Sequence, residues 1–353
     1  MRFPEFNGEW NVKRLDECVT FLDEQRKPIK STERSSEYKL YPYYGASGVI
    51  DYVDDYIFNE ELILLSEDGA NILDRNYRVA FIVKGKTWVN NHAHVLRPMK
   101  NVDISYLSEY LESLKYEKYN TGSTMPKLNQ EVCRSIKILL PEYAEQVKIG
   151  ILLSAINERI ATQIKIIEKL ESLIKGLCQT LFNFEEYSTY FLGDICSITT
   201  GKLDANAMVE NGKYPFFTCA EEVFSIDEYA FDAEALLISG NGANLGYIHY
   251  YNGKFNAYQR TYVLDKFAID INYVRLYLET FLKYRIEQEK NTGNTPYIVL
   301  GTLSKMKIKV PNTITQQKII QSIATLKEKF SIEKQSLKKY EEQKRYLLSN
   351  LFI

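Results

Sequence analysis

Polar side chains of types that can recognise a ligand occur at matching places in the two halves of the chain. Asn71 ends the turn Gly69-Ala70-Asn71, and Asn244 ends the similar turn Gly242-Ala243-Asn244. Asn and Gln can form paired hydrogen bonds with adenine, Arg can do so with guanine, and hydroxyl and backbone N–H groups can bind phosphate. These residue types therefore suit the recognition of nucleic acid.

Further polar segments recur in the same order along the chain. Asn90-Asn91-His92 corresponds to Tyr258-Gln259-Arg260, and Asn120-Thr121-Gly122-Ser123-Thr124 corresponds to Asn291-Thr292-Gly293-Asn294-Thr295. Turn and capping chemistry alone would explain any one of them, because Asn, Gly, Ser and Thr dominate turns. Recurrence in both halves favours contacts with a ligand. The residues predicted to contact DNA are Tyr43, Tyr44, Asn71, Asn91, His92, Thr121, Gly122, Ser123, Thr124, Lys127, Asn241, Asn244, Gln259, Arg260, Thr292, Gly293, Asn294 and Thr295.

Motifs of several enzyme classes are missing from the sequence. No Pro-Pro dipeptide is present, which excludes the N-P-P-[FY] motif of amino-methyltransferases. Gly85-Lys86-Thr87 resembles the end of a phosphate-binding loop, but the glycine expected five residues earlier is Ala80, so a hairpin turn is predicted there instead. No G-x-S-x-G elbow occurs, and with only three histidines and no paired cysteines we expect no metal site. The sequence therefore predicts a protein that is not an enzyme and that holds no cofactor.

Composition limits where the protein works and what it binds. The net charge of −2 and the pI of about 6.1 argue mildly against binding nucleic acid unaided. The five cysteines are scattered, as is typical of reduced thiols in the cytoplasm. No apolar stretch approaches the roughly 20 residues that cross a bilayer. We expect a cytoplasmic protein without a membrane partner, whose DNA contacts come from local patches or from a positively charged partner.

The sequence repeats itself. From Pro141 to Phe182, adding 170 to each residue number gives Pro311 to Phe352, with Gln146 over Gln316. Before this stretch, each half contains short β-rich runs separated by glycine and asparagine turns, and one amphipathic helix at about 103–116 or 270–285. The sequence therefore predicts a tandem duplication of an α+β module. The expected divisions are modules at 1–142 and 184–312, with a long helix after each at 143–183 and 313–353.

Each long helix carries an apolar seam with alternating steps of four and three residues. A seam of this period is typical of coiled coils, and each helix would be roughly 60 Å long. The duplicate helix is the obvious partner, although packing of each helix on its own module remains an alternative. The seam positions are Ile149, Leu153, Ile156, Ile160, Gln163, Ile167, Leu170, Ile174, Leu177, Leu181, Ile319, Ile323, Leu326, Phe330, Glu333, Leu337, Tyr340, Lys344, Leu347 and Leu351.

Several motifs resemble the specificity subunits of bacterial type I restriction-modification systems, and the resemblance covers essentially the whole chain. The motifs are Arg2-Phe3-Pro4-Glu5-Phe6, Gly8-Glu9-Trp10, Leu15, the N-T-G-[SN]-T segments, the proline and glutamine that open each helix, Leu177-x-x-x-Leu181-Phe182 and Leu347-x-x-x-Leu351-Phe352. The resemblance implies two target-recognition domains of mixed α/β structure, each reading one half of a bipartite asymmetric DNA site. It also implies that the two helices pair antiparallel with pseudo-two-fold symmetry and act as a spacer.

The resemblance also implies the partners. Two methyltransferase subunits would dock on the helices, bind S-adenosylmethionine and methylate adenine, and motor–nuclease subunits would cleave unmodified DNA. The methyltransferases would supply much of the phosphate contact that an acidic chain lacks. Two other hypotheses remain open from sequence: a specificity subunit for another restriction-modification type with a fused nuclease–methyltransferase, or a coiled-coil adaptor that binds protein.

Overall fold

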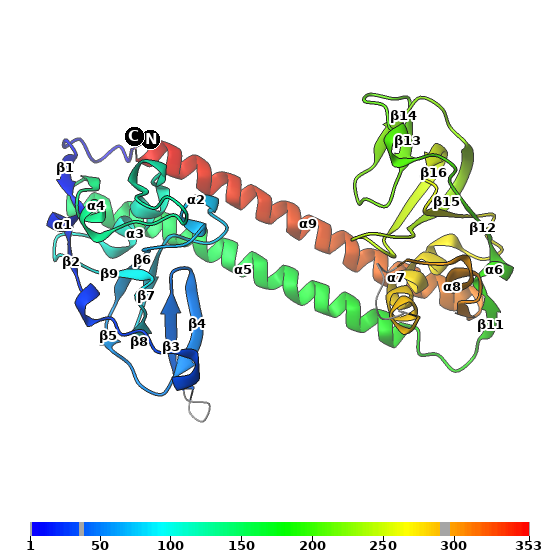
Figure 1. Ribbon diagram of the computed structural model, residues 1–353, viewed down its shortest axis with the longest axis horizontal. Helices are drawn as coiled ribbons and strands as arrows, with labels where there is room; N and C mark the ends of the chain where they lie inside the picture. The colour runs from blue at the N-terminus through cyan, green and yellow to red at the C-terminus, as the bar shows by residue number, and fades with distance from the viewer. Residues whose placement is uncertain (1, 35–38, 290–296, 353) are drawn as a thin grey trace. The chain divides into compact units, whose positions relative to one another are not determined.

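The computed structural model describes residues 2–34, 39–289 and 297–352 (Figure 1). It divides into two compact units. Unit 1 comprises residues 1–165 and 335–353, and unit 2 comprises residues 166–334. Each long helix contributes to both units, because α5 (Tyr143–Leu181) begins in unit 1 and ends in unit 2, whereas α9 (Thr313–Leu351) does the reverse.

Unit 1 contains two four-stranded sheets and a separate antiparallel strand pair. The strand orders are β2-β9-β6-β7 and β4-β3-β8-β5, and β1 pairs with β10. Its elements before α5 are β1 (Asn11–Arg14), α1 (Leu15–Cys18), β2 (Val19–Phe21), β3 (Tyr41–Gly45), β4 (Gly48–Val53), β5 (Phe58–Asn59), β6 (Leu62–Ser66), α2 (Asn71–Asp74), β7 (Ala80–Val83), β8 (Lys86–Val89), β9 (Ala93–Pro98), α3 (Ile104–Ser113), α4 (Gln130–Arg134) and β10 (Lys137–Leu140).

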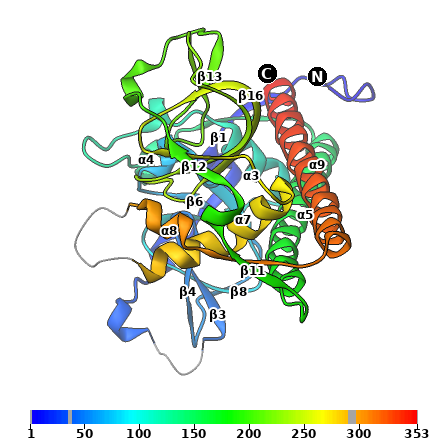
Figure 2. The same ribbon diagram turned by 90° about the vertical axis from the view of Figure 1, so that its right-hand side faces the viewer.

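Unit 2 contains one six-stranded sheet and the equivalent separate pair. The strand order is β12-β17-β15-β16-β13-β14, and β11 pairs with β18. Helix α7 packs against β15 (Figure 1), and Figure 2 shows α7 and α8 of the same unit. The elements before α9 are β11 (Ser188–Phe191), α6 (Leu192–Ile195), β12 (Ser197–Thr200), β13 (Tyr214–Phe217), β14 (Phe224–Ile226), β15 (Phe231–Ser239), β16 (Ile248–Ala257), β17 (Thr261–Asp265), α7 (Ile271–Gln288), α8 (Leu300–Ser304) and β18 (Lys307–Val310).

Unit 1 has two sheets where unit 2 has one, and the units differ in the strand that contains an equivalent glycine. In unit 2 the strand β16 runs unbroken from Ile248 to Ala257, and it includes Gly253 at a φ of 132°. In unit 1 the equivalent Gly85, at a φ of 72°, separates β7 from β8. These two strands pair with different neighbours, β6 for β7 and β3 and β5 for β8. The hairpin predicted at Gly85-Lys86-Thr87 is therefore wrong, because the chain passes from one sheet to the other instead of folding back.

The amphipathic helices late in each module are confirmed as α3 and α7. Asp103 caps α3 by accepting a hydrogen bond from the Tyr106 amide, and Asp270 caps α7 in a similar way. Their apolar faces lie in the main core of each unit, with Tyr106 and Tyr273 completely buried. The predicted fold class, two mixed α/β modules each followed by a long helix, is confirmed.

The N-terminal segment fastens the first turn of α5 to module 1. Arg2 donates two hydrogen bonds of 2.7 Å to the two carboxylate oxygens of Glu145, and Trp10 donates a third at 3.2 Å. The Glu145 side chain is fully buried. A buried carboxylate needs such donors because an unpaired buried charge is strongly destabilising. The opening motif of the sequence thus positions the start of the helix.

The seam residues behave as their spacing predicts. Every seam position on α5 and α9 is buried or half-buried. In unit 1, Ile149 and Leu153 of α5 share the core with Leu347 and Leu351 of α9. In unit 2, Ile319 and Ile323 of α9 share the core with the C-terminal end of α5. Within each unit, therefore, the beginning of one long helix packs with the end of the other.

Candidate nucleic-acid interface

Three loops that are far apart in sequence converge in unit 1. The Glu67 amide donates to the His92 carbonyl at 2.9 Å, and the Leu128 amide donates to the Glu67 carbonyl at 2.7 Å. A third bond of 3.0 Å joins the Gly69 amide to the Pro126 carbonyl. We call residues 67–71, 90–92 and 120–128 the first loop cluster. Backbone bonds of this kind fix the relative position of segments that have no regular structure.

Unit 2 contains the same arrangement. The Gly240 amide donates to the Arg260 carbonyl at 2.9 Å, and the Ile298 amide donates to the Gly240 carbonyl at 2.8 Å. Asn241 forms a β-bridge with Tyr297, as Asp68 does with Lys127 in unit 1. We call residues 240–244, 258–260 and 297–298 the second loop cluster. The duplication thus preserves the backbone framework of the loops as well as their sequence pattern.

Two pairs of predicted contact residues lie exposed at the same place in these clusters. Asn91 and His92 are exposed in the turn between β8 and β9, and Gln259 and Arg260 are exposed in the turn between β16 and β17. The His92 ring lies 2.9 Å from both carboxylate oxygens of Asp68. We call these the first and second polar pairs. These exposed side chains can contact a ligand that binds at the end of the sheet where the two turns lie.

The segment 120–127 forms a closed loop in the first cluster. Asn120 accepts hydrogen bonds from the amides of Gly122 and Lys127, and Thr121 donates both its amide and its hydroxyl to the Lys127 carbonyl. A Cβ atom at Gly122 would lie 1.8 Å from the Met125 carbonyl oxygen, so only glycine fits. Ser123 and Thr124, with Lys127, remain exposed. The corresponding predicted residues Thr292, Gly293, Asn294 and Thr295 lie outside the described part of the chain.

Other predicted contact residues have structural roles. Tyr43 is 1% exposed, and its hydroxyl accepts a hydrogen bond from the Ile29 amide. Tyr44 packs against a smaller core, where burial raises the pKa of its hydroxyl. The Asn71 amide group exchanges two hydrogen bonds with the Tyr77 backbone, at 2.7 and 3.1 Å. In this structure the buried Tyr43 side chain is not available to DNA, which corrects its assignment, whereas the Asn71 side chain is half-buried and its assignment stays a prediction.

The remaining two predicted residues lie within the second cluster. Asn241 and Asn244 are half-buried. Asn241 forms the bridge to Tyr297, and the carbonyl of Asn244 accepts the Tyr247 amide at 3.0 Å. Beside them a pocket of about 320 Å³ is lined by Thr200, Gly240, Gln259, Arg260, Tyr262 and Ile298. The second polar pair therefore borders a hollow with polar walls.

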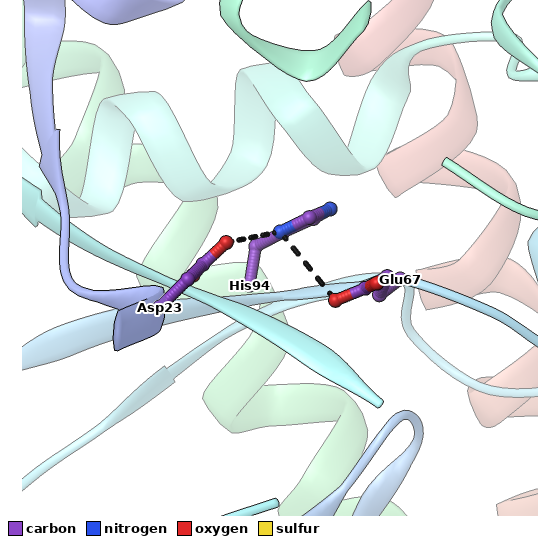
Figure 3. A group of neighbouring side chains, drawn as sticks. All are labelled: Asp23, Glu67 and His94. Atoms are coloured by element: carbon purple, nitrogen blue, oxygen red, sulfur yellow. Dashed lines mark hydrogen bonds and ion pairs between the residues drawn. The ribbon is translucent and has the colours of Figure 1, made fainter. Parts of the chain in front are cut away.

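A buried charge network that the sequence did not indicate underlies the first cluster (Figure 3). His94 Nδ1 lies 2.6 Å from Asp23, and His94 Nε2 lies 2.8 Å from the Leu128 carbonyl oxygen. Burial opposes the protonation of His94, but its hydrogen bond to Asp23 and the negative charge of that carboxylate outweigh this and raise its pKa to about 10. Burial also works against the Asp23 carboxylate, yet the bond from His94 keeps the pKa of Asp23 below its usual range. His94 is thus a cation that donates from both nitrogens.

The network fits an ion-pair cluster better than a metal centre. Asp23, Glu67 and His94 are close enough together to share a metal ion. However, Arg26 lies 2.7 Å from Glu67, and Lys127 lies 3.5 Å from the same carboxylate. A protonated histidine has no free lone pair for a metal, and the two carboxylates already face three cationic side chains. The residues present therefore fit no metal ion.

Taken together, these features define a class of protein: a duplicated recognition protein whose two modules each present an exposed polar loop cluster on a rigid sheet. Among the described residues no helix is long and apolar enough to cross a membrane. The model of the type I restriction modification DNA specificity domain matches residues 7–172 and 184–342. The chain belongs to this family.

Individual relatives agree with this assignment. The chain is 40% identical over 141 residues to the EcoDI specificity subunit of Escherichia coli, an alignment that covers 40% of this chain and 31% of that subunit. It is 26% identical over 336 residues to a putative type I specificity subunit of Haemophilus influenzae, covering 88% and 86% of the two chains.

Solved structures share the fold. The S subunit of a type I system from M. genitalium matches with a TM-score of 0.72 at 18% identity, covering 99% of this chain and 97% of that one. A chain from a structure of type I complex assembly and conformational transition matches with a TM-score of 0.58 at 14% identity, covering 99% and 98%. The module–helix–module–helix order is thus a shared architecture.

Proposed function

We propose that this chain is the sequence-specific DNA-recognition subunit of a type I restriction-modification complex. Each module reads one half of a bipartite, asymmetric site. The observation that carries the proposal is the family match over both modules, together with an equivalent loop cluster in each unit. The proposed base-reading groups are the polar pairs Asn91-His92 and Gln259-Arg260, because amides and guanidinium groups match the edges of bases in the major groove.

The other proposed DNA contacts come from the remaining residues of the two loop clusters and from the residues equivalent to them in sequence. Ser123 and Thr124 present hydroxyl groups, and Lys127 presents an ammonium group, all suited to phosphate. Thr121 and Gly122 donate their hydrogen bonds within the loop, so their proposed role is to hold these groups in place. Asn241 and Asn244 flank the second polar pair, and Thr292, Gly293, Asn294 and Thr295 are proposed by their sequence equivalence alone. Phosphate contacts position the modules on DNA, whereas base contacts determine the sequence that is read.

The proposed partners supply the chemistry. Two methyltransferase subunits dock on the long helices, bind S-adenosylmethionine and modify adenine, while motor–nuclease subunits cut unmodified DNA. The specificity subunit itself is proposed to be non-catalytic and, because its partner is DNA, cytoplasmic. A net charge of −2 supports shared phosphate binding, since a protein that holds DNA alone usually carries a basic excess.

Exchange of one module tests the proposal. Residues 1–142 are replaced by a module from another specificity subunit, and methylated sites are mapped genome-wide in cells that carry the partner subunits. One half of the methylated site should change while the other half stays intact. The reciprocal exchange of residues 184–312 is the control and should change the other half. If both halves change together in either exchange, independent reading by the modules is excluded.

Single substitutions test the polar pairs. Arg260→Ala should weaken the second half-site by about 1–3 kcal/mol and relax its specificity, since one well-placed bidentate contact contributes about that much discrimination. His92→Ala, at the equivalent position of module 1, should act on the first half-site alone. An adaptor that binds protein would show no change in DNA methylation with either variant.

A further inference from the structure

The two loop clusters are held to their sheets by different side chains that make the same hydrogen bond. In unit 1, His94 Nε2 donates to the Leu128 carbonyl at 2.8 Å. In unit 2, the Tyr262 hydroxyl donates to the Ile298 carbonyl at 3.0 Å. An imidazolium and a phenol are chemically different, but each carries a hydrogen-bond donor at the tip of a ring. What the two units share is therefore the hydrogen bond to the loop carbonyl and not the type of side chain.

The two donors occupy the same register position. His94 lies on β9 opposite Leu65 of β6, and Tyr262 lies on β17 opposite Ile238 of β15. In both sheets the next pair toward the loops contains the serine that ends the inner strand, Ser66 or Ser239. Each donor therefore lies one residue pair away from the end of the inner strand that leads into its loop cluster.

The residue that accepts this bond is fastened on both sides. Leu128 is fully buried and Ile298 is 4% exposed, and the amide of each donates to the loop after the inner strand, at Glu67 or Gly240. A buried carbonyl without a donor is costly, so the ring hydrogen bond decides where this residue can sit. The residue immediately before it, Lys127 or Tyr297, forms the β-bridge that completes the loop cluster.

In unit 1 the anchored Leu128 also fixes the position of the exposed loop 121–127. The Lys127 carbonyl accepts both the amide and the hydroxyl of Thr121, so residues 121–127 close on the residue next to Leu128. The His94 ring is oriented from below, because Asp23 accepts from its Nδ1 and is itself held by the Val95 amide and by Gln130. Movement of the ring would move the anchored end of the loop.

We propose that His94 and Tyr262 are equivalent positioning residues. Their hydrogen bonds hold the recognition loops of modules 1 and 2 at the distance from the sheet at which the polar pairs can read DNA. This inference rests on the proposed function. The hydrogen bond from His94 or Tyr262 then affects how well the complex discriminates each half-site from other DNA sequences. Neither side chain is assigned a contact with DNA.

Removal of one hydroxyl tests the inference in unit 2. The full chain carrying Tyr262→Phe is assembled with its methyltransferase subunits, and methylation of DNA libraries with either half-site randomised is sequenced. The ratio of matched to mismatched methylation should fall about tenfold at the second half-site, the effect of losing one donor to a buried acceptor. Discrimination at the first half-site should be unchanged.

The matched control is Tyr273→Phe. Tyr273 is a buried tyrosine of the same core whose hydroxyl donates to the Lys309 carbonyl of β18, a residue outside the second loop cluster. It should alter stability without altering discrimination at either half-site. Amide exchange of the complex gives a second measurement, because Tyr262→Phe should speed exchange of the Ile298 amide and Tyr273→Phe should not.

A one-hydroxyl comparison also tests unit 1. In the background Asp23→Asn, which removes the charge that His94 pairs with, His94→Tyr restores the donor found in unit 2 and His94→Phe does not. The tyrosine variant should discriminate the first half-site better than the phenylalanine variant.

Wild-type discrimination by Tyr262→Phe, or an equal loss with Tyr273→Phe, would overturn the positioning roles alone. A wild-type complex that methylates no bipartite site would overturn the proposed function and the positioning roles together.

Discussion

Phe352, at the C-terminal end of α9, packs edge-on against Tyr110 of α3, with ring centroids 5.1 Å apart. In unit 2 the equivalent ring at the end of α5, Phe182, packs edge-on against Tyr277 of α7 at 5.2 Å. Each long helix therefore begins next to its own module and ends in the core of the other unit. The closing Leu-Phe of each repeat is the anchor for this exchange.

Truncation of these rings should destabilise the two units separately. Phe182 is 3% exposed and contacts three aromatic rings, so Phe182→Ala should cost about 3–5 kcal/mol of the free energy of unfolding of unit 2. Phe352 is only half-buried, so Phe352→Ala should cost unit 1 less. Urea unfolding followed by site-specific amide exchange measures each unit.

The control is Tyr346→Ala, which removes a 58% exposed ring from the last part of α9. It should change the stability of unit 1 by less than about 0.5 kcal/mol, as exposed substitutions usually do. A stability of unit 2 within 1 kcal/mol of wild type for Phe182→Ala would show that the helix end is not an anchor.

The buried His94–Asp23 pair should make the stability of unit 1 depend on pH. The pKa of His94 rises from an ordinary value of about 6.5 to about 10 on folding, so its contribution is complete below pH 6.5 and is lost as the pH rises through 10. Between these values folding binds one proton, and the free energy of unfolding should fall by at most about 1.4 kcal/mol per pH unit.

Unfolding of unit 1 measured from pH 6 to 8, below the range where the buried thiols Cys18 and Cys196 affect stability, tests this dependence. The double variant Asp23→Asn/His94→Phe carries no titrating pair and should lose the slope, whereas unit 2, which has Tyr262 at this position, should show no such slope in that range. If wild-type unit 1 is equally stable at pH 7 and pH 8, His94 is not held as a cation.

Features set by local spacing could be predicted from the sequence, and features set by distant partners could not. The seam of α5 and α9 follows from apolar residues three and four apart, which one helix places on one face. The polar pairs were found because the duplication repeats them. By contrast, Tyr43 is buried by contacts with Ile29 and Arg34 that no periodicity specifies. Likewise, Asp23 and His94 are 71 residues apart and meet only when β9 enters the sheet.

The polar seam residues Gln163 and Glu333 are predicted to face each other where the long helices pair. They interrupt the two seams at equivalent positions, and in an antiparallel pair equivalent positions meet near the two-fold point. Gln163 is 7% exposed, as expected for a seam position. A polar seam residue commonly fixes register at a cost in stability. Gln163→Cys with Glu333→Cys should therefore form a disulfide within one chain under mild oxidation.

The control pairs Gln163→Cys with a cysteine one heptad away at Tyr340. Its Cα should lie beyond the roughly 7 Å that a disulfide can bridge, so it should cross-link poorly. Efficient cross-linking of the control, or none between positions 163 and 333, would contradict the predicted register.

The length of the long helices is predicted to set the spacing between the two half-sites. Modules that read the same face of DNA lie about one helical turn apart, or roughly 10 base pairs. One heptad inserted into each of α5 and α9 keeps the seam in phase and adds about 10 Å, at 1.5 Å per residue. DNA rises about 3.4 Å per base pair, so the spacer should grow by up to roughly 3 base pairs.

A four-residue insertion is the control, because it shifts the seam and should be tolerated less well. Genome-wide mapping of methylated sites gives the spacer directly. An active complex with the heptad insertions and an unchanged spacer would mean that the helices do not measure the distance between half-sites.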